Sequence, residues 1–249
     1  MLTLVLLLGT VAITPKEVSA KSANAKKIPV LTYHMVCTDS QRNSKYKNSS
    51  LAVSKSDFKK QMKWLKDNGY RTITCEELYQ WYKGEIKLPK KSVLITFDDG
   101  AKNVAENAMP ILKKYKLKAT VFIVGTRTWN NKSGTIGLKK MKKLMKEYPN
   151  IEFQSHTYSL HKEVKKKGAY DIVYKDAKKQ YKRFGFEYLA YPYGNYNSEM
   201  IKAYKAEGSI KMAFTYGHND YATRDQGIYK LRRIKIDAND GFSKFTRWF

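Results

Sequence analysis

The stretch from Leu94 to Gly100 reads LITFDDG, so an apolar run ends in two adjacent carboxylates and a glycine. The run 92–97, SVLITF, has the length and the β-branched and aromatic residues of a buried strand. Similar short runs recur along the chain and alternate with helical patterns. This alternation is typical of parallel strands joined by crossover helices. We therefore predict a single α/β domain.

The other strand candidates set the number of repeating units. They cover residues 29–36, 70–74, 118–124, 151–156, 188–193 and 212–216, with a weaker one at 231–236. Seven or eight strand–helix units in about 220 residues favour a closed barrel over an open sheet. In both architectures the functional side chains lie at the carboxyl ends of the strands.

Amphipathic patterns between these runs predict the helices. In the segment 56–69, Phe58, Met62 and Leu65 share one face, with Ser56 as the expected N-cap and a stop at Gly69. Further helices are expected at 105–116, 138–148, 170–185 and 198–208.

Three of the four histidines follow predicted strands: His34, His156 and His161, while His218 lies just after another. A single histidine at such a place is more often a hydrogen-bonded loop residue than a ligand. Two imidazoles and one carboxylate together, however, form a set that holds a divalent metal and leaves positions open for water. The metal lowers the pKa of that water from ~15.7 toward ~7. In LITFDDG one aspartate can bind the metal while its neighbour accepts the proton.

The net charge and the N-terminal residues indicate where in or outside the cell the protein acts. Lys and Arg number 48 against 22 Asp and Glu, a net charge of +26, which indicates an anionic neighbour or a lysine-rich solvated surface. Residues 1–13 are apolar apart from Thr and Gly but too short for a bilayer, and Val18-Ser19-Ala20 fits a secretory cleavage site. We expect a signal peptide at 1–20, a short linker at 21–28 and the catalytic domain at 29–249. The protein would be secreted, in contact with an anionic wall polymer or membrane surface, and would not meet nucleic acid.

The two cysteines, Cys37 and Cys75, leave two alternatives open. In an exported protein they could form a disulfide, or both could be buried free thiols.

Three motifs in order, TFDDG (96–100), SHTYSLH (155–161) and YPYG (191–194), resemble the polysaccharide deacetylase family, carbohydrate esterase family four. The resemblance covers about residues 28–240. The histidines stand five apart and LTYHMV occupies 31–36, which is similar to the branch that acts on poly-β-1,6-N-acetylglucosamine. The resemblance implies a distorted (β/α) barrel with about seven parallel strands.

The resemblance also implies roles for individual residues. The metal ligands would be Asp99, His156 and His161, with Zn²⁺ the favoured ion, although Co²⁺, Ni²⁺ and Fe²⁺ also accept this set. Asp98 would be the general base, His34 the general acid, and Tyr193 would give its backbone N–H to the oxyanion. Many members carry an arginine where this chain has Ala190, and we assign its base-orienting role to Arg233.

The implied reaction is removal of N-acetyl groups from a polymeric amino sugar by a monomeric enzyme. The alternatives are a deacetylase of peptidoglycan or a chitin-like chain, and a non-enzymatic module that binds an envelope polyanion. Glycoside hydrolysis fits poorly, because it needs two carboxylates ~5–9.5 Å apart on either side of the bond that breaks, whereas Asp98 and Asp99 are adjacent in the chain. Aromatic side chains that could stack on sugar rings are Tyr33, Tyr158, Tyr193 and Trp129.

Overall fold

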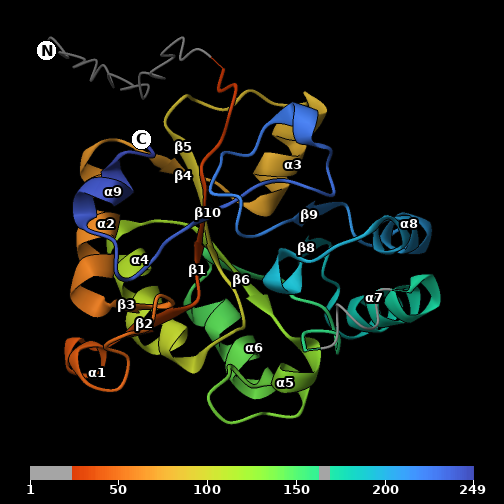
Figure 1. Cartoon of the computed structure of the whole chain (residues 1–249), viewed down its shortest axis with the longest axis horizontal. Coiled ribbons are helices and arrows are strands. Elements are labelled where there is room, and N and C mark those ends of the chain that lie inside the picture. The colour runs from red at the N-terminus through yellow and green to blue at the C-terminus, as the bar shows by residue number, and fades with distance from the viewer. Residues whose placement is uncertain (1–23, 163–168) are drawn as a thin grey trace, which may run out of the picture.

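The computed structural model describes residues 24–162 and 169–249. Parallel strands form one curled sheet in the order β10-β1-β5-β6-β7-β8-β9, with β4 paired to β5 at one end. Figure 1 shows these strands at the centre of the molecule with helices around them. The predicted distorted barrel in a single domain is confirmed.

The strands are β1 (Val30–Tyr33), β2 (Met35–Cys37), β3 (Ala52–Ser54), β4 (Arg71–Thr72), β5 (Ser92–Phe97), β6 (Ala119–Ile123), β7 (Ile151–Ser155), β8 (Tyr188–Ala190), β9 (Met212–Phe214) and β10 (Ile234–Lys235). The α-helices are α1 (Asp39–Asn43), α2 (Lys55–Asp67), α3 (Cys75–Lys83), α4 (Met109–Tyr115), α5 (Gly125–Trp129), α6 (Leu138–Glu147), α7 (Tyr170–Phe184), α8 (Ser198–Glu207) and α9 (Phe242–Thr246). Shorter turns are η1 (Val104–Ala108), η2 (Pro192–Gly194) and η3 (Arg224–Gln226).

The segment 231–236 joins the two edges of the sheet. Its first residue, Leu231, forms a parallel bridge with Phe214 at the end of β9. Three residues later, Ile234 in β10 pairs with Leu31 of β1. The weakest strand candidate therefore lies between the last and the first strands, and only two of its residues are regular strand.

Strand β5 shows why this part of the chain folds as it does. All six of its residues are buried, as expected for a parallel strand covered on both faces. Ile95 and Phe97 pack into the cluster that the helices α2, α4 and α6 cover, whereas Leu94 belongs to a second, inner cluster with Phe122 and Phe214. Because side chains alternate along a strand, the row that begins with Leu94 continues to the position after the strand end, Asp98.

Some details differ from the sequence predictions. The N-cap of α2 is Ser54, whose hydroxyl accepts the backbone N–H of Asp57 at 3.0 Å, so the assignment of Ser56 is wrong. The helix predicted at 105–116 begins as a π-helical turn, η1, before α4. Helices α7 and α8 do end at Gly185 and Gly208, both with positive φ.

Burial settles the open alternative for the cysteines and two of the aromatic candidates. Cys37 and Cys75 are both free, buried thiols. Tyr33 and Tyr158 are buried in the fold, so neither of these two candidates presents a ring face to a polymer. Tyr33 instead donates its hydroxyl hydrogen bond to Gln61 at 2.8 Å.

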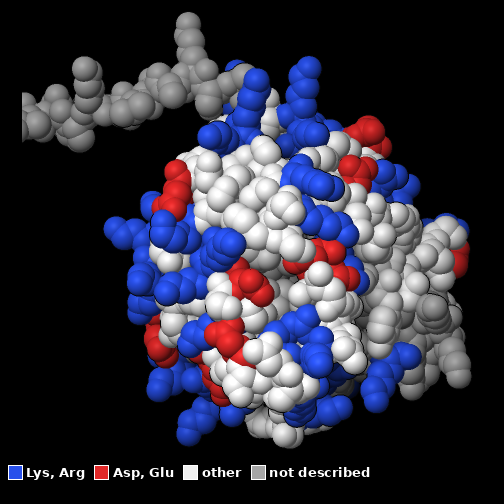
Figure 2. Space-filling model, turned by 60° about the vertical axis from the view of Figure 1, so that its left-hand side comes forward, with Lys and Arg blue, Asp and Glu red and all other residues white. Residues whose placement is uncertain are grey.

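The predicted signal peptide lies outside the described residues, and so does the start of the expected linker. In the described part of that linker, Ala25 and Ile28 are buried against the barrel. Within residues 24–162 and 169–249, no helix has both the length and the apolar character needed to cross a bilayer. Figure 2 shows that Lys and Arg side chains are spread around the visible face, with acidic side chains among them.

Candidate metal centre and active site

The side chains predicted from the strand ends come together at one end of the barrel. His34 lies at the break between β1 and β2, Asp98 and Asp99 directly follow β5, and His156 directly follows β7. Contacts described below connect these residues to one another and to Arg233, which immediately precedes β10. The fourth histidine, His218, is exposed, and within residues 24–162 and 169–249 no contact joins it to this group.

Asp99, His156 and His161 form the candidate metal centre. Each offers one ligand atom, and these three atoms lie within 4.8 Å of one another. Nδ1 of His156 donates to the carbonyl of Ala190 at 2.7 Å, which leaves the lone pair on Nε2 free for a metal. Burial lowers the pKa of His156 to about 4, so the imidazole is neutral at pH 7, as a metal ligand must be. The donor set therefore fits a divalent cation.

Backbone strain is concentrated at this centre. Asp99, Thr157 and Tyr193 all have positive φ, of 70°, 67° and 57°. Non-glycine residues rarely adopt this region, and such residues gather at functional sites because the surrounding fold holds them there. The turn at Asp99 separates its carboxylate from that of Asp98, and Gly100 continues the turn with φ of +63°.

Asp98 is held by Arg233 in a buried, two-pronged ion pair. The guanidinium donates to both carboxylate oxygens, at 2.8 and 2.7 Å, and Arg233 has no exposed surface. Burial alone would raise the pKa of Asp98, but the positive charge and the hydrogen bonds of Arg233 act in the opposite direction, and the pKa lies below its ordinary value. Arg233 also donates to the carbonyl of Thr215 at 2.8 Å, which fixes the guanidinium in place.

His34 faces the two aspartates from the other side. Burial lowers the pKa of His34 below its ordinary value, although the charges of Asp98 and Asp99 act in the opposite direction. Its ring packs edge-on against Tyr216, with 5.4 Å between the ring centroids. Burial and the charge of Asp98 raise the pKa of Tyr216 to about 12, so this phenol remains neutral beside His34.

Tyr193 lies over the metal centre and is open to solvent. Its ring centroid is 5.0 Å from that of His161, and 59% of the residue is exposed. The following residue, Gly194, packs so tightly that a Cβ there would lie 2.5 Å from the backbone nitrogen of Tyr216. This close approach fixes the backbone that carries the Tyr193 N–H.

Two further residues at the site were not found from the sequence. Arg127 in α5 donates to Asp99 Oδ1 and contacts His161 Nδ1, each at 2.9 Å. Asp176 in α7 accepts the backbone N–H groups of Tyr158 and Ser159 at 2.8 Å, which holds the loop between the two histidines. Arg127 follows a strand end, and Asp176 is an acid on the buried face of a helix. Both residues could therefore have been identified from the sequence.

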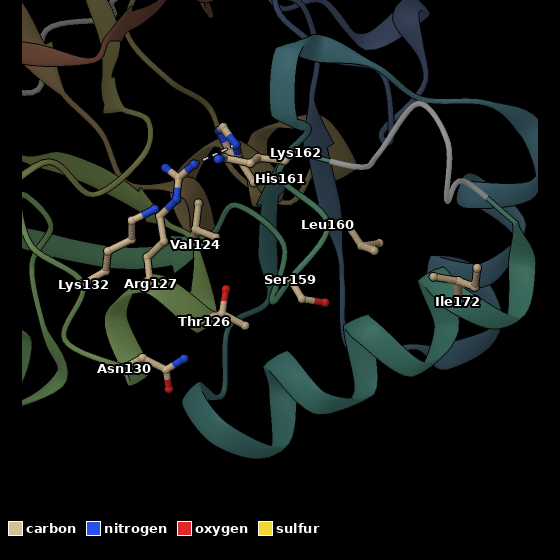
Figure 3. A pocket seen from close by; sticks show the side chains of 10 residues that line it. All are labelled: Val124, Thr126, Arg127, Asn130, Lys132, Ser159, Leu160, His161, Lys162 and Ile172. Atoms are coloured by element: carbon tan, nitrogen blue, oxygen red, sulfur yellow. Dashed lines mark hydrogen bonds between the residues drawn. The ribbon is translucent and has the colours of Figure 1, made fainter.

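A cavity of about 680 Å³ opens beside His161 (Figure 3). Its wall contains apolar side chains and hydroxyl groups together with three cationic side chains. The residues that line it include Arg127, Lys132, Ser159, Leu160, Lys162 and Ile172. A cavity of this size holds a sugar unit.

Comparison with known proteins adds independent information. A family model described as polysaccharide deacetylase matches residues 85–209. The poly-β-1,6-N-acetyl-D-glucosamine N-deacetylase of Staphylococcus epidermidis is 33% identical over 238 residues, which cover 89% of this chain and 78% of that protein. The structure of the Streptococcus pyogenes deacetylase PplD in complex with acetate has a TM-score of 0.78 at 29% identity, covering 89% of this chain and 97% of that one. IcaB from Ammonifex degensii shares the fold, with a TM-score of 0.71 at 24% identity over 90% of this chain and 96% of that one.

Proposed function

Because this chain belongs to the polysaccharide deacetylase family, and is therefore a carbohydrate N-deacetylase, we propose that its substrate is poly-β-1,6-N-acetylglucosamine in an extracellular matrix. The observation that supports the hydrolytic chemistry is the pairing of Asp98 with Arg233 beside the Asp99, His156 and His161 cluster. The relative from S. epidermidis, which carries that substrate in its name, matches across 89% of this chain and so supports the choice of polymer.

The protein groups divide the work of amide hydrolysis. A divalent cation on Asp99, His156 and His161 would supply positive charge for the acetamide oxygen and acidify the attacking water. Asp98, ionised and oriented by Arg233, takes the proton of that water. The backbone N–H of Tyr193 donates to the oxyanion of the tetrahedral intermediate. His34 protonates the leaving amine, which otherwise departs poorly from carbon.

The geometry of Asp98 supports its role as base. A carboxylate offers about four lone-pair positions, and the two prongs of Arg233 use one on each oxygen. The remaining positions can accept a proton from water. The ion pair also keeps the carboxylate charged at neutral pH, as a base must be.

The experiment that tests the substrate compares linkages. We expect acetate release from β-1,6-linked N-acetylglucosamine oligomers to exceed release from β-1,4-linked oligomers of the same length, by at least tenfold in kcat/KM. An Asp98→Asn variant is the negative control for contaminating activity. Equal or faster release from the β-1,4 oligomers would assign the enzyme to peptidoglycan or a chitin-like chain instead.

The metal and the location are also proposals. We propose Zn²⁺ as the resident ion, since two imidazoles and a carboxylate are a usual zinc set. Metal analysis of the purified protein, followed by chelation and reloading with Zn²⁺, Co²⁺, Ni²⁺ or Fe²⁺, tests this.

We also propose that the protein is exported and acts at the cell surface, because residues 1–20 have the pattern of a signal peptide. The N-terminal sequence of the protein recovered from culture medium checks that proposal.

A further inference from the structure

The cavity beside the metal centre gathers positive charge. Arg127, Lys132 and Lys162 all line it, and no acidic residue among residues 24–162 and 169–249 does. In the view of Figure 3, the side chains of Arg127, Lys132 and Lys162 extend toward the part of the cavity where the ring of His161 lies, while Leu160 and Ile172 lie on the other side. Like charges held together repel, and the repulsion is relieved when an anion binds among them.

The carboxylate of Asp99 does not use all of the hydrogen-bond donors of Arg127. Arg127 uses one N–H donor on Asp99 Oδ1 and directs a second nitrogen to His161 Nδ1. A guanidinium has five N–H donors, so about three remain free to bind another group. Among the described residues, neither Lys132 nor Lys162 has an acidic partner, and both side chains are exposed.

The same charge continues away from the metal centre. A second hollow, of about 540 Å³, shares Lys132 with the first, and none of the described residues in its wall is acidic. Its other cations are Lys102, Lys139, Lys140 and Lys143. Within the described part of the chain, Lys102 alone among these has an ion pair, with Glu106 at 3.2 Å. The two hollows together form a basic track that starts at Arg127 and ends on α6.

Resting on the proposed deacetylase function, we propose that this basic track is a substrate subsite for an acidic group carried by the polymer, on a sugar next to the one that loses its acetyl group. The first cavity has room for a whole sugar, which is more than the product acetate needs. Its apolar side, at Leu160 and Ile172, suits the face of a ring, and its cationic side suits a carboxylate or a phosphate on that ring. The preferred substrate is thus an N-acetylated polysaccharide with acidic substituents.

The test uses three matched probes. They are a β-1,6-linked N-acetylglucosamine trisaccharide, the same trisaccharide carboxymethylated on one ring, and the same trisaccharide phosphorylated on one ring. We expect kcat/KM for acetate release from at least one acidic probe to exceed that from the neutral probe by about tenfold at low salt. Added 0.5 M NaCl should reduce this preference, because screening acts on exposed charges. The acidic probe that is preferred identifies the substituent.

Variants of the track connect the preference to these residues. The double variant Lys132→Gln, Lys162→Gln should lose most of the preference for the acidic probe, and Lys132→Glu should reverse it. Lys59→Gln is the control, since Lys59 is exposed on α2, which packs against α4 and α9 and lines neither hollow. Arg127 is left intact because it contacts Asp99.

The outcomes separate the two proposals. Equal rates on neutral and acidic probes, or a preference that survives in the double variant, would overturn the subsite while leaving the deacetylase assignment intact. Absence of acetate release from all three probes, with metal bound, would instead contradict the proposed β-1,6 substrate.

Discussion

Arg233 grips Asp98 through both oxygens although the two residues are 135 positions apart in sequence. The pair is buried: the side chain of Arg233 has no exposed surface, and that of Asp98 is 3% exposed. A buried pair of this kind is costly to break from one side, because the remaining charge is left without compensation. The contact therefore controls both the ionisation of the base and its direction.

We predict that Arg233→Met raises the pKa of Asp98, because the charge that offsets burial is lost. A base works only when ionised, so the acidic limb of the pH–rate profile should move to higher pH by about 1–3 units. The variant should also lose about 3–5 kcal/mol of unfolding free energy. Urea unfolding and kcat/KM across pH measure the two effects.

The neighbouring arginine provides the matched control for that experiment. Arg232 pairs with Asp220 at 2.7 Å on the surface, where 46% of its side chain is exposed. Arg232→Met should change neither the pH profile nor the stability by more than about 1 kcal/mol. Arg233→Lys keeps the positive charge but loses the two parallel N–H donors of the guanidinium. This variant should retain the position of the acidic limb and have a lower kcat. An unchanged acidic limb in Arg233→Met would mean that Asp98 is not the titrating base.

The adjacent aspartates should respond differently to the same substitution. Asp98→Asn removes the base and is expected to lower kcat by ~10²–10⁴-fold while the protein still binds metal. Asp99→Asn removes a ligand and should lower the metal content of the purified protein. Elemental analysis and acetate release on both variants check this, and full metal loss in Asp98→Asn would reverse the two roles.

His34→Gln should remove the alkaline limb of the pH–rate profile. A general acid must be protonated, so the wild-type rate falls as pH rises through the pKa of His34, which burial holds below its ordinary value. The variant cannot donate a proton, and its rate should be lower by about 10²–10⁴-fold with little pH dependence on that side. A substrate with a leaving group that needs no proton should restore much of the rate to His34→Gln, and failure to do so would argue for a structural role.

Asp176→Asn tests how the loop between His156 and His161 is held. Asp176 accepts two backbone N–H groups and the Ser159 hydroxyl, and burial raises its pKa above the ordinary value. The amide variant keeps the shape but has one acceptor oxygen fewer, so metal affinity should fall by about 10–100-fold. Asp171→Asn, exposed on the same helix, is the control. Competition with a chromogenic chelator measures the affinities, and equal values would exclude the positioning role.

The sequence predicted the parts of the fold that depend on local pattern. Strand β5 has the predicted bounds, and helices α7 and α8 end at their predicted glycines, because burial on both faces and left-handed caps leave clear signals. Strand 29–36 was predicted as one element but is divided at His34 into β1 and β2. No periodicity marks such a break, since tertiary contacts create it.

Within the site, the sequence predicted residues that follow strands better than residues that come from elsewhere. Asp99, His156 and His161 were placed by the strand-end rule and lie together. Because Ala190 stands at the usual arginine position, Asp98 needed another partner, and Arg233 was chosen by resemblance to the branch that has an arginine in a similar late segment. The structure places Arg233 on Asp98. The sequence could not exclude Tyr33 from the candidate aromatic residues, because a strand residue near its end can point inward as readily as outward.

The seam at which β10 docks on β1 makes the active site depend on both ends of the folded chain. His34 and Arg233 lie outside the matched family region, 85–209. Strand β1, which ends just before His34, pairs with both β5 and β10, and Arg233 immediately precedes β10. Proteolytic removal of the chain from residue 231 onward would thus take away Arg233, the partner of Asp98, while the three candidate metal ligands stay in the chain. Metal occupancy of a preparation is accordingly no measure of how many of its molecules are competent.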